Sequence, residues 1–100
     1  MIDQPITPTE RVLEILSSPG GVAVLRELLS GPKRFSELQN ATQISPRTLS
    51  MRLKEMEAAQ ILIRTQYPEI PPRVEYRLTE RGEGLRGVLE ALEAWQKRYG

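Results

Sequence analysis

The stretch ISPRTLSMRLKEMEAA, residues 44–59, carries basic and hydroxyl side chains, with no carboxylate between Ser45 and Lys54. Ser45 is a good N-cap, and Pro46 suits the first helical position because its missing N–H would have no partner there. We therefore expect a helix over 45–59. Helical spacing puts Leu49, Leu53 and Met56 on one face and Arg47, Met51 and Lys54 on roughly the opposite face.

The outward face of this helix suits contact with nucleic acid. Guanidinium and ammonium groups bind phosphate oxygens and guanine edges, and hydroxyl groups add further hydrogen bonds. A helix about 10–12 Å in diameter also fits the major groove of B-DNA, which is about 12 Å wide. The alternative is a surface helix whose charges are only solvated. The elements on either side of this helix must distinguish the two interpretations.

Composition restricts the other function classes. The 100 residues contain neither cysteine nor histidine, which removes disulfides, thiol chemistry, and the commonest general base and zinc ligand. We expect no catalytic residue, no metal and no cofactor; a small enzyme is the alternative that measured turnover would support. The net charge of +1 does not by itself indicate nucleic acid, so the distribution of charge matters more than its sum.

The length and the absence of a long apolar run favour one domain over residues 1–100 in a cytoplasmic protein. Two helices are expected at its start. Thr7 can cap the first, which opens at Pro8 and runs to Leu16. The run SSPGG then breaks the chain before a second helix over 22–29.

A third, short helix is expected after Gly31 and Pro32, with Ser36 as its cap and 40–43 as its end. Lys33 and Arg34 stand just before its amino terminus, where backbone N–H groups and basic side chains suit phosphate binding. A short helix, a tight turn and a longer basic helix together indicate a helix-turn-helix.

After residue 59 the pattern alternates, which predicts a hairpin with strands over 61–67 and 74–78. The connection PEIPPR is stiffened by prolines, and Arg73 can reach out from it. A hairpin directly after the second helix of a helix-turn-helix is typical of a wing. A hairpin that only covers the core is the alternative, and one face can serve each purpose.

A final helix, capped by Thr79 and running to Tyr99, has apolar residues at steps of three and four. Its far end lies too distant from so small a core to be covered by the same chain, so we expect a homodimer; packing within the chain is the alternative. The dimerisation helices are 7–16 and 80–99. The expected interface residues are Leu13, Leu16, Leu85, Val88, Leu89, Leu92, Trp95 and Tyr99.

The runs LRELLSGPKRFSEL (25–38), IS.R.L..RLKE.E (44–57) and IR..YP..PPRVEY.LTE.G (63–82) resemble the HxlR family of winged-helix regulators, relatives of MarR-type repressors. The resemblance implies a mainly α fold with a small β-hairpin, in the order α-α-α-α-β-β-α. It also implies a prokaryotic, dimeric transcriptional regulator. Because a two-fold dimer would place its two recognition helices in successive major grooves of double-stranded DNA, we expect a pseudo-palindromic operator. The recognition helix would be Ser45 to Ala59 and the wing Ile63 to Leu78.

This chain departs from the family pattern at three places. Val22 and Ala23 replace a Lys-Trp pair, and Gln60 stands where a glycine usually ends the recognition helix. The early cysteine of many members is absent, so thiol-dependent sensing is not expected. Nothing in the sequence nominates a small-molecule effector, an operator or the sign of regulation.

The expected DNA contacts divide by role. Candidates for base edges are Arg47, Ser50, Met51 and Lys54, beside the helix-start hydroxyls of Ser45 and Thr48. Lys33, Arg34 and Arg52 would hold phosphates, and Arg73 would reach the flanking minor groove or backbone. The alternative is a winged helix that contacts an acidic protein partner and does not bind DNA.

Overall fold

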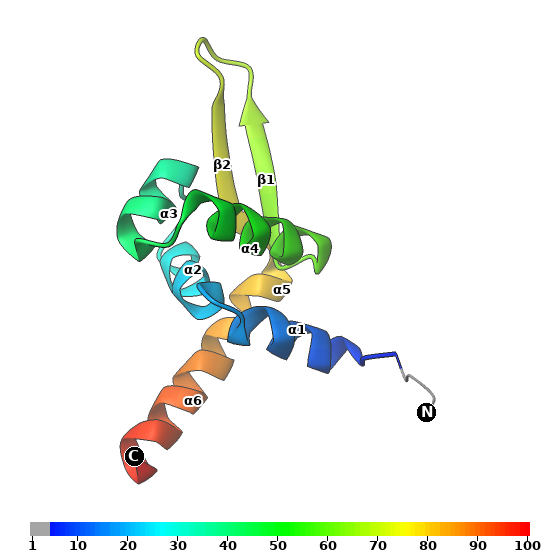
Figure 1. The fold of residues 1–100 in the computed structure, drawn as a ribbon, viewed down its shortest axis with the longest axis vertical. Helices are drawn as coiled ribbons and strands as arrows, with labels where there is room; N and C mark the ends of the chain where they lie inside the picture. Colours follow the sequence, from blue (N-terminus) through cyan, green and yellow to red (C-terminus); the bar gives the residue numbers. More distant parts are fainter. Residues whose placement is uncertain (1–4) are drawn as a thin grey trace.

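The computed structural model describes residues 5–100, so the first four residues of the expected domain lie outside the described part. Figure 1 shows the order of elements. They are α1 (Pro8–Ser17), α2 (Gly21–Leu29), α3 (Phe35–Thr42), α4 (Pro46–Ala58), β1 (Leu62–Tyr67), β2 (Arg73–Leu78), α5 (Glu80–Glu83) and α6 (Leu85–Tyr99). The expected mainly α fold with a single hairpin is confirmed, with the last helix divided in two.

The core lies where α1, α2, α4 and the base of the hairpin meet. Its fully buried members come from α2, α3, α4 and the start of the hairpin: Val24, Leu25, Leu28, Leu38, Leu49, Met56, Ile61 and Leu62. Helix α1 begins as predicted, because the Glu10 N–H donates to Thr7 Oγ1 at 3.1 Å and the Thr7 N–H donates to Glu10 Oε2 at 3.0 Å.

Helices α3 and α4 form the helix-turn-helix on this core. The Thr48 N–H donates to Ser45 Oγ at 3.2 Å, which confirms Ser45 as the cap of α4. The predicted cap of α3 was wrong: the helix starts at Phe35, so Ser36 lies inside it. Its start is fixed instead by the Arg34 N–H, which donates to Glu37 Oε1 at 2.8 Å.

The hairpin pairs its strands antiparallel from Leu62 opposite Leu78 to Tyr67 opposite Arg73. A short third segment joins its edge, since Lys33 and Tyr76 exchange backbone hydrogen bonds of 2.9 and 2.8 Å. Gln60 adopts a left-handed φ of 60°, the conformation that a glycine would favour there. The turn into the wing therefore keeps a left-handed residue without a glycine.

The final helix is shorter and more divided than predicted, because Gly84 separates α5 from α6. Leu89 was expected in a dimer interface, but it is buried in the core of its own chain, 5% exposed. Beyond Leu89, α6 extends away from the body in the direction opposite to the hairpin (Figure 1). None of the helices among residues 5–100 has the length and apolarity needed to cross a membrane.

Two glycines near this junction should respond in opposite ways to alanine. A Cβ at Gly82 would lie 2.1 Å from the Ile61 carbonyl oxygen, whereas a Cβ at Gly87 meets nothing within 4 Å. We expect Gly82→Ala to lower the free energy of unfolding by about 2–3 kcal/mol through overpacking. Gly87→Ala should raise it by up to about 1 kcal/mol through helix propensity.

Urea unfolding followed by circular dichroism, with all proteins at one concentration, measures both changes. Similar effects of the two substitutions would contradict the close approach of α5 to the residues that precede β1.

Candidate nucleic-acid interface

The outer face of α4 presents the residues that the sequence pattern placed there. Arg47, Met51 and Lys54 are exposed, while the inner residues Leu49, Leu53 and Met56 are buried. Neither Arg47 nor Lys54 forms an ion pair within residues 5–100. Two uncompensated cations therefore stand seven residues apart on one face of a helix.

The hydroxyl groups at the start of α4 are partly used within the helix. Ser45 Oγ accepts from the Thr48 N–H and donates to Thr48 Oγ1 at 3.1 Å. Ser50 is half-buried beside the exposed Met51. The Ser45 and Thr48 side chains thus define where the helix begins, and Ser45 is exposed there.

Arg52 was expected to hold a phosphate, and the structure corrects this. The Arg52 side chain is only 6% exposed, and a Cβ at Gly20 would lie 3.9 Å from its Cγ. Its Nε lies 3.1 Å from Glu55 Oε1, an ion-pair distance, but without the alignment of a hydrogen bond. The turn before α2 covers this arginine, so it is part of the interior.

Lys33 and Arg34 lie where the sequence placed them, before the amino terminus of α3. Lys33 is fixed by its backbone pairing with β2, and its Nζ donates to Ser30 Oγ at 3.1 Å. Arg34 is exposed, and its side chain forms no ion pair among the described residues. The backbone pairing of Lys33 with Tyr76 joins the segment before α3 to the hairpin.

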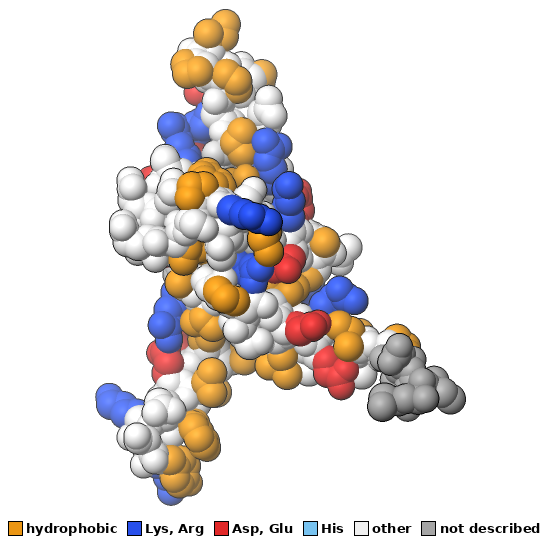
Figure 2. All heavy atoms as spheres, viewed as in Figure 1, with side chains coloured by type: hydrophobic (Ala, Val, Ile, Leu, Met, Phe, Trp, Pro, Cys, Tyr) orange, Lys and Arg blue, Asp and Glu red, His pale blue; other side chains and the backbone are white. Residues whose placement is uncertain are grey.

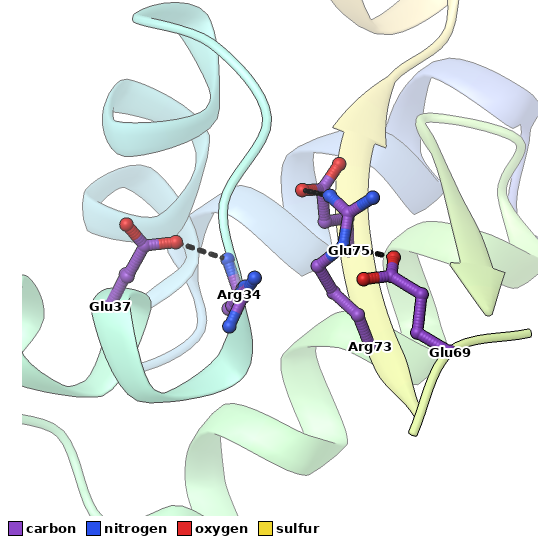
Figure 3. Close-up of polar contacts among 5 residues, drawn as sticks. All are labelled: Arg34, Glu37, Glu69, Arg73 and Glu75. Atoms are coloured by element: carbon purple, nitrogen blue, oxygen red, sulfur yellow. Dashed lines mark hydrogen bonds and ion pairs between the residues drawn. The ribbon is translucent and has the colours of Figure 1, made fainter. Parts of the chain in front are cut away.

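Arg73 does not reach out of the wing as expected. Its Nε donates to Glu69 Oε2 at 2.8 Å, its Nη1 donates to Glu75, and its guanidinium lies 4.0 Å from the centre of the Tyr67 ring. Figure 3 shows the two carboxylates on either side of the guanidinium. The hydrogen bond with Glu69, aided by the charge of Glu75, raises the pKa of Arg73. Its charge is already compensated within the hairpin.

Three exposed wing residues were not among the expected DNA contacts. Arg64 and Arg77 are exposed on the strands and form no ion pair within the described part of the chain, and Ile70 at the tip is fully exposed. Strand alternation offered a signal for Arg64, because it places this residue on the same face as Gln66. Figure 2 shows cationic side chains over α4 and along the hairpin, with apolar side chains at its tip.

Two other features bear on chemistry. Residues 5–100 bring together no group of three or more acidic, histidine or cysteine side chains that would hold a metal ion. A half-open hollow of about 420 Å³ lies between α1 and the end of α4. It is lined by Arg11, Glu14, Ile15, Ser18, Glu55, Ala58 and Ala59. Spacing along the chain did not predict that these residues of α1 and α4 would line a common hollow.

Comparison with known proteins identifies the family to which this chain is similar. The model of the HxlR-like helix-turn-helix family matches residues 15–100. An uncharacterised HTH-type transcriptional regulator of Synechocystis sp. is 43% identical over 88 residues, which cover 87% of this chain and 65% of that protein. One from Methanothermobacter thermautotrophicus is 45% identical over 78 residues, covering 77% of this chain and 60% of that protein. The chain thus spans less than two thirds of the length of either relative.

Solved structures agree with the sequence matches. The reduced form of the transcriptional regulator YodB from B. subtilis superposes with a TM-score of 0.86 at 33% identity, over 96% of this chain and 95% of that chain. The likeness therefore includes the helix-turn-helix, the hairpin and the terminal helices together. On the family match and these relatives, the chain belongs to the HxlR-like helix-turn-helix family.

Proposed function

We propose that this chain is a sequence-specific, DNA-binding transcriptional regulator that acts as a homodimer on a pseudo-palindromic operator in the cytoplasm of a prokaryote. The observation that carries the proposal is the outer face of α4, where Arg47 and Lys54 are exposed and unpaired within residues 5–100. Membership of a helix-turn-helix family supports the same surface as the one that contacts DNA.

In this proposal α4 lies in the major groove. Arg47, near its amino terminus, bonds a guanine edge, and Ser50, Met51 and Lys54 face the following bases. Lys33 and Arg34 contact phosphates at the start of α3. Ser45 and Thr48 lie close to the backbone at the entrance of the groove. Arg52 has no part in this surface, because it is buried.

The second half of the proposal is the dimer. One stripe of α6 leaves large apolar side chains exposed, and Leu13 of α1 is exposed too: Leu13 59%, Val88 51%, Leu92 56%, Trp95 57% and Tyr99 67%. Leu16 and Leu85 are half-buried at the edge of the core beside this stripe. Large exposed apolar patches of this kind mark protein interfaces.

We take a second copy of this chain as the partner that covers the stripe, because a two-fold dimer would also present two α4 helices to one DNA duplex. Two-fold pairing through α1 and α6 would place two α4 helices for successive major grooves, about 34 Å apart along the duplex. The operator would then be pseudo-palindromic, because the symmetry of the protein is matched by the symmetry of its site.

The first test measures binding to a fluorescent DNA duplex by anisotropy over a salt series. We expect the logarithm of the affinity to fall linearly with the logarithm of salt concentration, with a slope of about −0.9 for each phosphate neutralised. Arg47→Ala should reduce affinity for the selected operator by about ten- to a hundredfold, the worth of one bidentate guanine contact. If Arg47→Ala leaves the affinity for operator and for random DNA unaltered, the outer face of α4 does not contact DNA. That result is the one expected of a winged helix that contacts an acidic protein partner.

A matched pair in α4 separates exposed cations from the buried one. Lys54→Met and Arg52→Met remove one positive charge each, two residues apart in the same helix. We expect Lys54→Met to weaken binding in the same salt series, with a shallower slope if its ammonium group also neutralises a phosphate. Arg52→Met should leave the slope unchanged because its guanidinium is covered by the protein. A shallower slope for Arg52→Met would show that the Arg52 guanidinium becomes accessible and neutralises a phosphate on binding.

The dimer is tested by a second matched pair in α6. Leu92 lies in the apolar stripe, and Ala94 lies about half a turn away around the helix. We expect Leu92→Asp to yield monomers and Ala94→Asp to leave dimers, because only the first places a charge in the interface. Sedimentation velocity at micromolar concentration distinguishes the two masses. Dimers of unchanged affinity in the Leu92→Asp protein would place the interface elsewhere.

A further inference from the structure

Helix α6 is attached to the body of its own chain along one face. Of the residues in α6, all of which the structure describes, only Leu89 is buried. Arg86 and Glu93 lie on the same face as Leu89 at helical spacing, and both bond to α2. These three residues are among those that line a hollow of about 290 Å³ with Arg26 and Leu29 of α2. We call the contact between these five residues the α2–α6 joint.

The strongest bond of the joint satisfies the end of α2. The Leu29 carbonyl, at the last residue of α2, lacks the usual backbone donors. Pro32 has no N–H to offer it, and the Lys33 N–H donates instead to the Tyr76 carbonyl at 2.9 Å. Arg86 Nη2 donates to the Leu29 carbonyl at 2.7 Å. A cation at the carboxyl end of a helix also interacts favourably with the helix dipole, so Arg86 ties the start of α6 to the end of α2.

An ion pair forms the second attachment. Arg26 Nη2 donates to Glu93 Oε1 at 3.0 Å, and the two side chains are 58% and 56% exposed. An exposed ion pair is weak by itself. Its place matters more, because Glu93 lies about 10 Å along the helix axis from Arg86. Two attachments separated along the axis, with the buried Leu89 between them, oppose a tilt of α6 against α2.

The covalent connection does little to hold α6 in place. Gly84 separates α5 from α6, and a Cβ at Gly87 in the first turn of α6 would meet nothing within 4 Å. Glycines give the backbone more freedom and lower its helix propensity. Beyond Leu89 the helix extends away from the body (Figure 1). The direction of α6 therefore depends on the joint.

The joint also determines where the apolar stripe of α6 faces. The stripe residues Val88, Leu92, Trp95 and Tyr99 are exposed and lie about a third of a turn around the helix from the joint residues. In the proposed dimer the stripe contacts the second copy, whereas α4 packs in the same core as α2. The path from one α4 to the other therefore crosses the joint of each protomer.

A small change at the joint is enough to alter the DNA geometry. From Leu89 to Tyr99 the helix extends about 15 Å, at about 1.5 Å per residue. A tilt of about 13° displaces the end of a lever of about 15 Å by about 3.4 Å, which is the rise of one base pair. Recognition helices displaced by that distance would match half-sites one base pair closer together or further apart.

We propose that the α2–α6 joint determines which half-site spacing the dimer accepts. Arg86 is the main positioning residue, and the pair of Arg26 with Glu93 prevents α6 from tilting. None of these three side chains contacts DNA in this proposal. The inference rests on the proposed DNA binding and the proposed dimer.

The first test measures affinity for operators whose half-sites are moved closer together or further apart by one base pair. The parent protein should prefer one spacing. We expect Arg86→Met to reduce the ratio of affinities between that spacing and its neighbours by about three- to tenfold, since one charge-assisted hydrogen bond is lost. Partial unfolding cannot change this ratio, because both affinities are measured with the same preparation.

Lys97→Met is the control for the loss of a cation from α6. Lys97 forms no ion pair within residues 5–100, so this variant should keep the ratio of the parent. An unchanged ratio in Arg86→Met, or a parent protein that binds all spacings equally, would overturn the inference.

The ion pair is tested by exchanging its charges. Glu93→Arg places a like charge beside Arg26 and should lower the ratio of affinities, whereas Glu93→Arg combined with Arg26→Glu should restore most of it. Lost packing would not be repaired by the second substitution. Glu90→Gln should keep the parent ratio, because Glu90 forms no ion pair in the described part of the chain. A double variant that behaves like Glu93→Arg alone would overturn the role of the ion pair.

A distance measurement tests the joint without DNA. The chain contains no cysteine, so Glu57→Cys at the exposed end of α4 gives one spin-labelling position in each protomer. Double electron–electron resonance then measures the distance between the two α4 helices of the dimer. We expect a narrow distribution in this protein and a broader one when Arg86→Met is added. Equal widths would show that Arg86 does not position α6.

These outcomes differ from a failure of the proposed function. A parent protein without salt-dependent DNA binding would refute DNA recognition, and a monomeric parent would refute the dimer and the joint with it. If the parent is a dimer that binds one spacing, and the variants keep both its ratio of affinities and its distance distribution, only the inference about the joint is refuted.

Discussion

The burial of one face of α4 determines what the rest of the molecule can present. Leu49, Leu53 and Met56 are held at 0–3% exposure in a core shared with α1, α2 and the base of the hairpin. Since side chains recur every 3.6 residues, fixing these three also fixes the outward direction of Arg47 and Lys54. The interface is therefore a consequence of the core, because a rotation of α4 would expose leucines.

The wing depends on a different constraint, the hydrogen bonds along its edge. Lys33 and Tyr76 exchange two backbone bonds, so the segment before α3 cannot move independently of β2. Arg73 then stiffens the outer part of the hairpin by bridging Glu69 and Glu75. The same molecule thus combines a rigid cationic helix with a rigid hairpin whose end is apolar.

Local chemistry made most of the fold predictable. The start of α1 follows from Thr7 and Pro8 and that of α4 from Ser45 and Pro46, because capping and proline geometry act within one turn. The hairpin follows from alternation. The division at Gly84 was not predicted, because a glycine lowers helix propensity but does not determine at which residue a helix ends. Likewise Gln60 adopts the left-handed conformation that a glycine favours, and the residue type glutamine does not predict this.

The sequence by itself determined which face of α4 is basic and that α6 carries an apolar stripe, because helical periodicity follows from spacing alone. Only the tertiary structure decided which members of those faces are accessible. Arg52 lies under the turn at Gly20, Leu89 joins its own core, and Arg73 is enclosed by its neighbours. The physical reason is that burial and ion pairing depend on which side chains of other helices and strands lie next to a residue. The spacing of residues within one helix carries no information about those neighbours.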